Sequence, residues 1–212
     1  GDDELARLAA ACAAHDALVL ADEVWEHVLF DGRRHVPFSS LPGMAERTVK
    51  VGSAGKIFSL TGWKVGWTVA PPPLAEAVAR AHQFVTFSTP PNLQAAVAWG
   101  LGAAMDEVAA TGAAFAAARD RMRAGLEAEG FAPLPAEGTY FLSVDLAGSG
   151  IAAGDLAFCE RAVKEAGVAA IPVSAFYAEE AVTNVVRLCF AKQPETVDEG
   201  IARLGRARAL FG

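Results

Sequence analysis

The chain has 212 residues, of which 53% are apolar, and it carries a formal net charge of −7 at pH 7. This length and this apolar fraction are sufficient for a buried core, so we expect a globular fold. Acidic and basic residues are interspersed and there is no basic run, which argues against a nucleic acid or an anionic membrane surface as a partner.

The cysteines and the lack of a long apolar segment indicate the compartment. Cys12, Cys159 and Cys189 are widely spaced, odd in number and set among apolar residues. We therefore expect reduced core thiols, with neither disulfides nor a metal site. No stretch is apolar over the length that a bilayer requires. These features predict a cytoplasmic protein with no membrane partner.

The first half of the chain alternates short apolar strands with amphipathic helices. An acidic segment from residue 2 to residue 4 is typical of the first turn of a helix. Ala17 to Ala21 is typical of a buried parallel strand and places Asp22 at its C-terminal end, where ligands bind in open α/β sheets. Further strands are expected at 48–51 and 65–70, and helices at 74–84 and 93–103. The alternation predicts an α/β fold with a doubly wound, mostly parallel sheet.

A long helix and then a mixed set of elements follow. Apolar residues recur at helical intervals from about Met105 to Glu129, and Gly130 is suited to end that helix. Beyond it we expect strands at 139–144, 169–173 and 185–191, and helices at 155–166 and 194–210. The sequence therefore predicts two parts, residues 1–105 and a small α+β domain at 106–212, with the long helix at about 105–129 as their link.

The stretch from Val51 to Trp67, VGSAGKIFSLTGWKVGW, combines the groups with the most chemistry. Ser53, Lys56 and Lys64 lie among four glycines, so the backbone can approach a ligand closely. An uncharged lysine in a desolvated pocket attacks carbonyl groups to form a Schiff base, and the second lysine and the hydroxyl could hold a phosphate. This combination favours pyridoxal phosphate as the ligand.

Two other motifs share these residues. A nucleotide-binding P-loop does not fit, because Gly52 is two residues too close to the Gly-Lys pair and Ile57 follows the lysine. Ser53 and Lys56 also fit the S-x-x-K motif of penicillin-recognising acyl-transfer enzymes, with Ser53 as nucleophile. The S-D-N and K-T-G tripeptides that accompany that motif do not occur in the chain. A surface lysine in a glycine-rich turn is the remaining interpretation.

Several further segments flank this stretch in a fixed order. DEVWEHVLFDG precedes it, and FSTPPNLQAA, EGTYF, PVSAFY and RLCFAK follow it. Together they resemble the fold type I, class I/II aminotransferases that use pyridoxal 5'-phosphate, most closely the branch of kynurenine and glutamine transaminases and cysteine-conjugate β-lyases. The resemblance implies that residues 1–105 are the C-terminal portion of the cofactor-binding large domain and 106–212 the small C-terminal domain. It also implies that this is the C-terminal half of an enzyme that forms homodimers.

The resemblance assigns Lys56 and Asp22 to catalysis. Lys56 would form the Schiff base with the cofactor and, once displaced by the amino substrate, would carry the transferred proton as a free amine. Asp22 would pair with the protonated pyridine nitrogen, which keeps the ring able to accept electrons. Glu23 is expected to face away from Asp22, because side chains alternate along a strand.

Ser53, Lys64 and Arg187 are assigned to anionic groups by the same resemblance. Ser53 and Lys64, three residues before and eight after Lys56, would bind the cofactor phosphate. Arginine is common at the later position, and lysine keeps the charge without the bidentate geometry. Arg187 stands in an otherwise apolar strand, and it would bind the substrate α-carboxylate. A structural ion pair is the alternative role for Arg187.

Trp25 departs from the family pattern. Many members carry tyrosine three residues after the aspartate, where the phenol contacts the cofactor's O3′ oxygen. An indole N–H donates a hydrogen bond but cannot accept one. Two roles for Trp25 stay open, namely a donor to that oxygen and a residue that only lines the pocket.

The function implied is amino transfer between an amino acid and a 2-oxo acid through Lys56. A carbon–sulfur β-lyase that uses the same cofactor is the near alternative. An S-x-x-K acyl-transfer enzyme and a non-catalytic fragment are alternatives of other classes. Because other cofactor contacts of the family would lie in an absent half, we expect the 212 residues in isolation to be poorly active.

Overall fold

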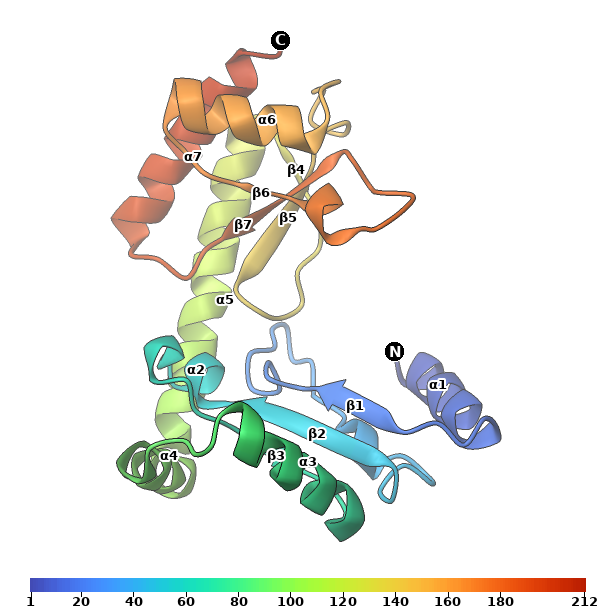
Figure 1. The fold of residues 1–212 in the computed structure, drawn as a ribbon. Helices are drawn as coiled ribbons and strands as arrows, with labels where there is room; N and C mark the ends of the chain where they lie inside the picture. The colour runs from blue at the N-terminus through green and yellow to red at the C-terminus, as the bar shows by residue number, and fades with distance from the viewer. The chain divides into compact units, whose positions relative to one another are not determined.

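The computed structural model describes residues 1–212, which form two compact units, Gly1–Gly112 and Ala113–Gly212. The division falls within the long helix α5, Met105–Ala128 (Figure 1). The boundary expected after residue 105 stays a prediction about the domains of the complete enzyme. No helix combines the length and the apolar character needed to cross a membrane.

The first unit contains a three-stranded sheet in the order β1-β2-β3, with bounds Val19–Asp22, Thr48–Ser53 and Gly66–Val69. β1 and β2 are parallel, with Asp22 opposite Val51, as the sequence predicts. β2 and β3 are antiparallel, with Ser53 opposite Gly66. The link between β2 and β3 contains only short helical turns, and a parallel crossover needs a helix that crosses the sheet face. The antiparallel pair follows from that short link.

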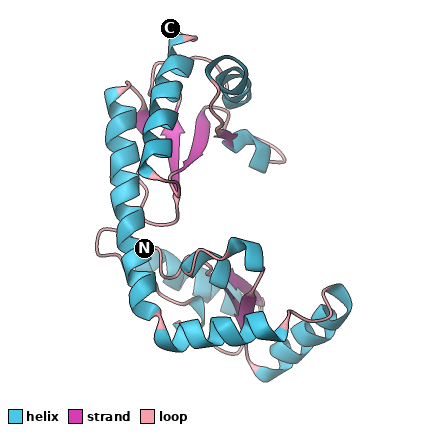
Figure 2. Ribbon diagram, turned by 90° about the vertical axis from the view of Figure 1, so that its left-hand side faces the viewer, coloured by secondary structure: helices cyan, strands magenta, loops and turns pink.

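Three helices longer than a single turn accompany this sheet before α5 begins, namely α1 (Asp2–Ala14), α3 (Pro72–Val85) and α4 (Pro91–Ala103). The structure begins α3 and α4 two residues before the positions expected from apolar spacing. Each begins at a proline, whose missing N–H has no helical partner to lose in the first turn. Figure 2 shows that helices make up more of the chain than strands do.

Two apolar clusters stabilise the first unit. In one, Ala9 of α1 packs with Phe38 and Met44 from the loop between β1 and β2. In the other, Ala54 and Val65 pack with Val97 of α4. The second cluster fixes the segment between β2 and β3 against α4, and this segment carries Lys56.

The second unit contains a four-stranded antiparallel sheet in the order β4-β5-β7-β6, with bounds Ala132–Pro133, Phe141–Asp145, Val185–Cys189 and Ile171–Pro172. Its helices are the C-terminal part of α5, α6 (Asp155–Arg161) and α7 (Pro194–Ala209). A π-helical turn continues α6 over residues 162–166 and ends at Gly167. These elements give the α+β unit that the sequence predicts.

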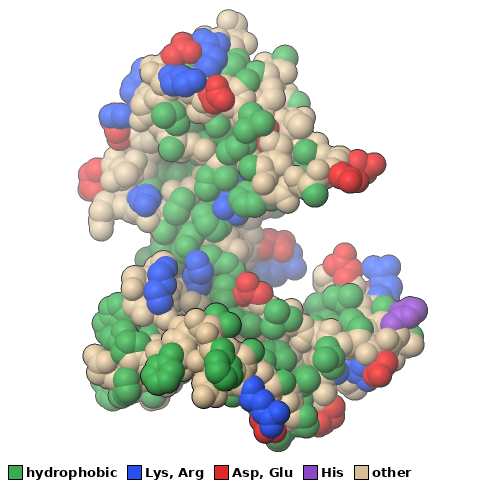
Figure 3. All heavy atoms as spheres, viewed as in Figure 1, with side chains coloured by type: hydrophobic (Ala, Val, Ile, Leu, Met, Phe, Trp, Pro, Cys, Tyr) green, Lys and Arg blue, Asp and Glu red, His purple; other side chains and the backbone are tan.

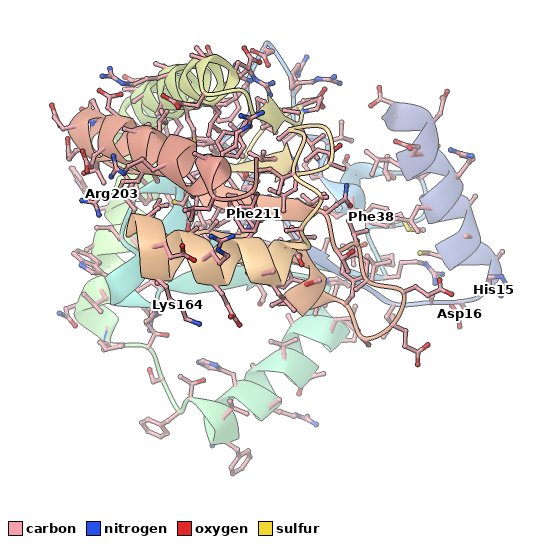
Figure 4. All side chains as sticks on the ribbon, turned by 90° about the horizontal axis from the view of Figure 1, so that it is seen from above. His15, Asp16, Phe38, Lys164, Arg203 and Phe211 are labelled. Carbon is pink, nitrogen blue, oxygen red and sulfur yellow. The ribbon has the colours of Figure 1, made fainter.

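Aromatic packing anchors α6 in this unit. Phe158 is fully buried between Phe131 and Phe211, with ring centroids 6.3 Å and 5.6 Å away. Figure 4 labels Phe211 together with Lys164, which follows α6, and Arg203 of α7. Arg203 donates to the carbonyl of Gly167, which ties α7 to the end of the π-helical turn.

Large apolar side chains also reach the surface of the first unit. Phe84 and Val85 at the end of α3, Phe87 after it and Trp99 of α4 are all exposed. Figure 3 shows hydrophobic side chains gathered over these helices. Leu18 and Leu20 are exposed at β1, so the sheet also carries uncovered apolar residues.

Candidate active site

Lys56 lies on α2, a single helical turn over Ala54–Ile57 that follows β2 directly. Ala54 and Ile57 are almost fully buried, whereas Lys56 is only half-buried. The Lys56 Nζ atom lies 4.8 Å from the centroid of the Trp25 ring. The structure thus places the expected nucleophilic amine beside Trp25, although 30 residues separate the two in the sequence.

A cavity of about 390 Å³ surrounds this turn. Ser53, Lys56 and Lys64, which the sequence analysis grouped together, all line it. Its other lining residues are Val24, Val51, Gly52, Gly55, Thr61, Val65 and Gly66. The cavity lining therefore includes two ammonium groups and the Ser53 hydroxyl, which suits an anionic ligand.

Thr61 is a lining residue that the sequence analysis missed. Its Oγ1 donates a hydrogen bond to the carbonyl of Gly55 at 3.0 Å. The signal was present, because a hydroxyl residue stands between Lys56 and Lys64 in the same glycine-rich stretch. That bond ties the turn that carries Lys56 to the segment that leads to Lys64.

The glycines of the stretch serve packing as well as ligand access. A Cβ atom on Gly52 would lie 2.3 Å from the Trp67 ring, and one on Gly66 would lie 2.8 Å from the carbonyl oxygen of Gly52. The close approach at these two positions is to the protein itself, and not only to a ligand as the sequence suggests. Gly62 differs, because nothing lies within 4 Å of a Cβ placed there.

Lys64 adopts a backbone conformation that is uncommon for a residue with a side chain. Its φ is +56°, in the left-handed region. Such conformations persist where surrounding structure imposes them, and they cluster at functional sites. Here the conformation ends a 3₁₀ turn, η2 (Thr61–Trp63), and leads the chain into β3 at the rim of the cavity.

Asp22 lies at the C-terminal end of β1 and is exposed. Its Oδ1 accepts a hydrogen bond from the Val24 N–H at 3.3 Å, and Val24 lines the cavity. Glu23 is instead buried, and its carboxylate accepts the Phe38 N–H at 2.7 Å. The two neighbouring carboxylates have different surroundings, as strand alternation predicts.

Glu23, Glu26 and His35 form a compact group of potential metal ligands, with ligand atoms within 4.8 Å of one another. Lys50 of β2 already provides a cation to this group. It pairs with Glu26, and its Nζ lies 3.7 Å from Glu23. The two carboxylates are therefore already paired with a cation, and the cluster is an internal ion network.

Arg187 belongs to the second unit, on β7 opposite Ser143 of β5. Its guanidinium lies against two aromatic rings, 4.1 Å from the centroid of Phe141 and 4.8 Å from that of Phe176. Its Nε atom is buried without a hydrogen-bond partner. The structural ion pair considered as an alternative is not found, and a buried guanidinium nitrogen without an acceptor favours an anionic ligand.

Comparison with known proteins decides the family. The model of the family described as aminotransferase class I and II matches residues 2–204. The chain belongs to this aminotransferase family. Its members use pyridoxal phosphate, which agrees with the donor set of the cavity around Lys56.

Aminotransferases of several specificities are among the relatives. A probable N-succinyldiaminopimelate aminotransferase of Mycobacterium tuberculosis is 40% identical over 210 residues, which are 95% of this chain and 53% of the relative. A mouse kynurenine–oxoglutarate transaminase 1 is 36% identical, over 95% of this chain and 52% of the relative. The chain spans about half the length of the curated relatives it matches.

A solved aminotransferase structure confirms the fold. The N-succinyldiaminopimelate aminotransferase from Mycobacterium tuberculosis aligns with a TM-score of 0.94 and 40% identity. The alignment covers 98% of this chain and 54% of the solved one. The resemblance to class I/II aminotransferases and the predicted α/β fold are thus both confirmed.

Proposed function

We propose that the protein is a pyridoxal-phosphate-dependent aminotransferase whose covalent attachment point is Lys56. The observation that carries this proposal is the cavity in which Lys56, Ser53 and Lys64 meet, with the Trp25 ring beside the amine. The complete reaction belongs to the whole protein, because the chain spans about half of its curated relatives.

The residues around the cavity divide the work of holding the cofactor. When bound, pyridoxal phosphate supplies an aldehyde and an electron-accepting ring. Lys56 Nζ would condense with the aldehyde carbon, with release of water, and as a free amine would carry the transferred proton. Ser53 Oγ would donate to the phosphate, and Lys64 Nζ would pair with its charge. The exposed carboxylate of Asp22 would hold the proton on the ring nitrogen.

Trp25 has a different role from the tyrosine common in the family. Its ring contacts Lys56 Nζ through the aromatic face. A cation over an indole face is attracted by the ring quadrupole, with an energy of about 0.5–2 kcal/mol depending on desolvation. We assign Trp25 to holding the amine in the cavity.

Arg187 binds the α-carboxylate of the amino acid and of the 2-oxo acid. Its guanidinium lies over two phenyl rings, and its Nε is left to donate to a ligand. A planar guanidinium fork matches a carboxylate in two parallel hydrogen bonds. We infer a cytoplasmic homodimer as the working form of the complete enzyme, by resemblance to the family.

A spectroscopic titration tests the proposal. Addition of pyridoxal phosphate to the protein should give the absorbance change of a lysine-linked aldehyde, and Lys56→Gln should abolish it. The control variant Thr183→Gln, in the second unit, should leave it intact. Equal absorbance changes in the protein and in Lys56→Gln would overturn the proposal. With bound cofactor, conversion to the pyridoxamine form that a 2-oxo acid reverses indicates amino transfer, whereas pyruvate release from a β-substituted amino acid indicates a β-lyase.

The 212 residues in isolation should turn over slowly. We propose that Lys56, Ser53 and Lys64, which line the cavity, supply only part of the cofactor contacts and that the remaining contacts of the family lie elsewhere in the complete enzyme. The rate of oxo-acid-dependent amino transfer by the purified chain tests this expectation. Robust turnover would show that the chain is self-sufficient.

A further inference from the structure

The ion network of the first unit lies on both sides of Trp25 in the chain. Glu23 and Glu26 flank the tryptophan, and Lys50 of β2 contacts both carboxylates. All three side chains are largely buried, with exposed fractions of 7% for Glu23, 13% for Glu26 and 16% for Lys50. Charges with so little water around them interact more strongly than surface pairs do.

The backbone between the two glutamates is also fixed. The Glu26 N–H donates to the Glu23 carbonyl at 3.0 Å, and the Val28 N–H donates to the Trp25 carbonyl at 2.9 Å. Val28 is 1% exposed, so the second of these turns is anchored in the core. The Glu23 carboxylate is held in addition by His35 Nε2 at 2.8 Å. The turn that presents Trp25 therefore has fixed ends.

Lys50 connects this turn to the strand that leads to Lys56. It lies on β2, three residues before Ser53, and α2 follows that strand directly. The Lys50 ammonium group therefore links the Trp25 turn to β2, and β2 leads directly to the helical turn that carries Lys56. The Trp25 ring in turn contacts Lys56 Nζ, so the Trp25 turn is connected both to β2 and to the lysine that follows it.

We propose that Lys50, Glu23 and Glu26 are positioning residues that hold the Trp25 ring against Lys56. The proposal rests on the proposed function, because it gives the network a purpose in placing the cofactor-binding amine. The network acts through Trp25, because none of its three side chains lines the cavity around Lys56. A network weakened at Glu26 should let the indole leave the amine while the sheet stays intact.

Glu26→Gln is the variant that separates positioning from folding. Removal of Lys50 would leave two buried carboxylates without their cation, which is strongly destabilising. Glu26→Gln retains the side-chain volume, and Lys50 keeps Glu23 as its counter-ion. The matched control is Glu76→Gln, which breaks the exposed ion pair between Glu76 and Arg80 on α3 of the same unit.

The first readout is the ¹⁹F NMR spectrum of the protein labelled with 5-fluorotryptophan. The chain has four tryptophans, and Trp25→Phe assigns the resonance of Trp25. In Glu26→Gln the Trp25 resonance should shift and broaden while the other three stay in place, and Lys56→Met should also shift it. Glu76→Gln should change none of the four. An unmoved Trp25 resonance, or equal movement of all four, would overturn the proposal.

The second readout is the rate at which borohydride traps pyridoxal phosphate on Lys56, measured by peptide mass. Glu26→Gln should lower this rate roughly three- to tenfold, because an indole that has moved no longer holds the amine in position for the aldehyde. Glu26→Asp, which restores the charge, should recover part of the loss. An unchanged rate would contradict the positioning role. If Lys56 is modified in no variant, the proposed function fails, whereas the fluorine spectra still decide whether the network positions Trp25.

Discussion

The Arg187 guanidinium lies over the rings of Phe141 and Phe176, and its buried Nε has no hydrogen-bond partner. The rings stabilise the cation without consuming its hydrogen-bond donors, because a ring face attracts charge and accepts no conventional hydrogen bond. A side chain held in this way is prepared for a carboxylate. The sequence placed an arginine in an apolar strand, and the family resemblance assigned it to the substrate carboxylate. The aromatic contacts become visible only in the fold.

Arg187→Lys should weaken binding of a 2-oxo acid by roughly tenfold or more. A bidentate guanidinium–carboxylate pair is replaced by a single flexible ammonium, and hydrogen bonds to charged groups contribute about 1.5–3 kcal/mol. The Nε–Hε resonance of Arg187 in the ¹⁵N NMR spectrum reports binding to the native side chain. Calorimetry compares the affinities of the native protein and of Arg187→Lys for the 2-oxo acid. Equal affinities of the two proteins would remove Arg187 from the site.

Cys159 gives a prediction that depends on pH. Burial raises the pKa of its thiol from the ordinary value of 9.0 to about 11, and the charge of Asp155 adds to the shift. The thiolate is the reactive form, so at about pH 8 an alkylating reagent should modify the half-buried Cys12 faster than Cys159. Mass spectrometry of the alkylated peptides measures the two rates. Unfolding in denaturant should make all three cysteines react alike.

The raised pKa of Cys159 also makes the free energy of unfolding depend on pH. The folded thiol holds its proton above the pH at which the unfolded thiol loses it. The contribution of this group is therefore complete below about pH 9 and is lost as the pH rises towards about 11. Urea unfolding of the protein and of Cys159→Ala across this range should show a steeper loss of stability in the native chain. Parallel losses would contradict the assignment.

At the scale of elements, the strongly patterned segments were predictable and the weakly patterned ones were not. β1, β2, β7 and the long α5 lie within two residues of their expected bounds, because each has a continuous apolar run or a helical repeat. β4 has two residues, which is too few to give a pattern. The antiparallel direction of β3 depends on how its link folds back, and local sequence does not encode that directly.

Gly52 and Gly62 differ in the space around them, so substitutions at the two positions test the packing role of glycine in this stretch. A Cβ on Gly52 would overlap the Trp67 ring at 2.3 Å, whereas a Cβ on Gly62 would meet nothing within 4 Å. Overpacking of this kind costs about 1–3 kcal/mol, so Gly52→Ala should lower the free energy of unfolding by that amount. Gly62→Ala is the control and should leave it nearly unchanged. Denaturant titration of both variants provides the comparison, and equal stabilities would contradict the packing role of Gly52.

At the scale of the whole molecule, the sequence brought Ser53, Lys56 and Lys64 together because all three fall within one short stretch. It assigned Trp25 to the site only through the family pattern. The contact of Trp25 with Lys56, and the network of Lys50 with Glu23 and Glu26, join residues that lie far apart in the chain. Such contacts depend on strand order and register, so they could be recognised only in the folded chain.

One lysine carries the account of this aminotransferase-family chain, and its reactivity can be measured directly. The protein is incubated with pyridoxal phosphate, reduced with borohydride and digested, and the modified peptide is located by mass. We predict that the modification falls on Lys56 and is absent from Lys50, which is held in its ion network, and from Lys64. Modification confined to another lysine, or spread evenly over all of them, would contradict the account.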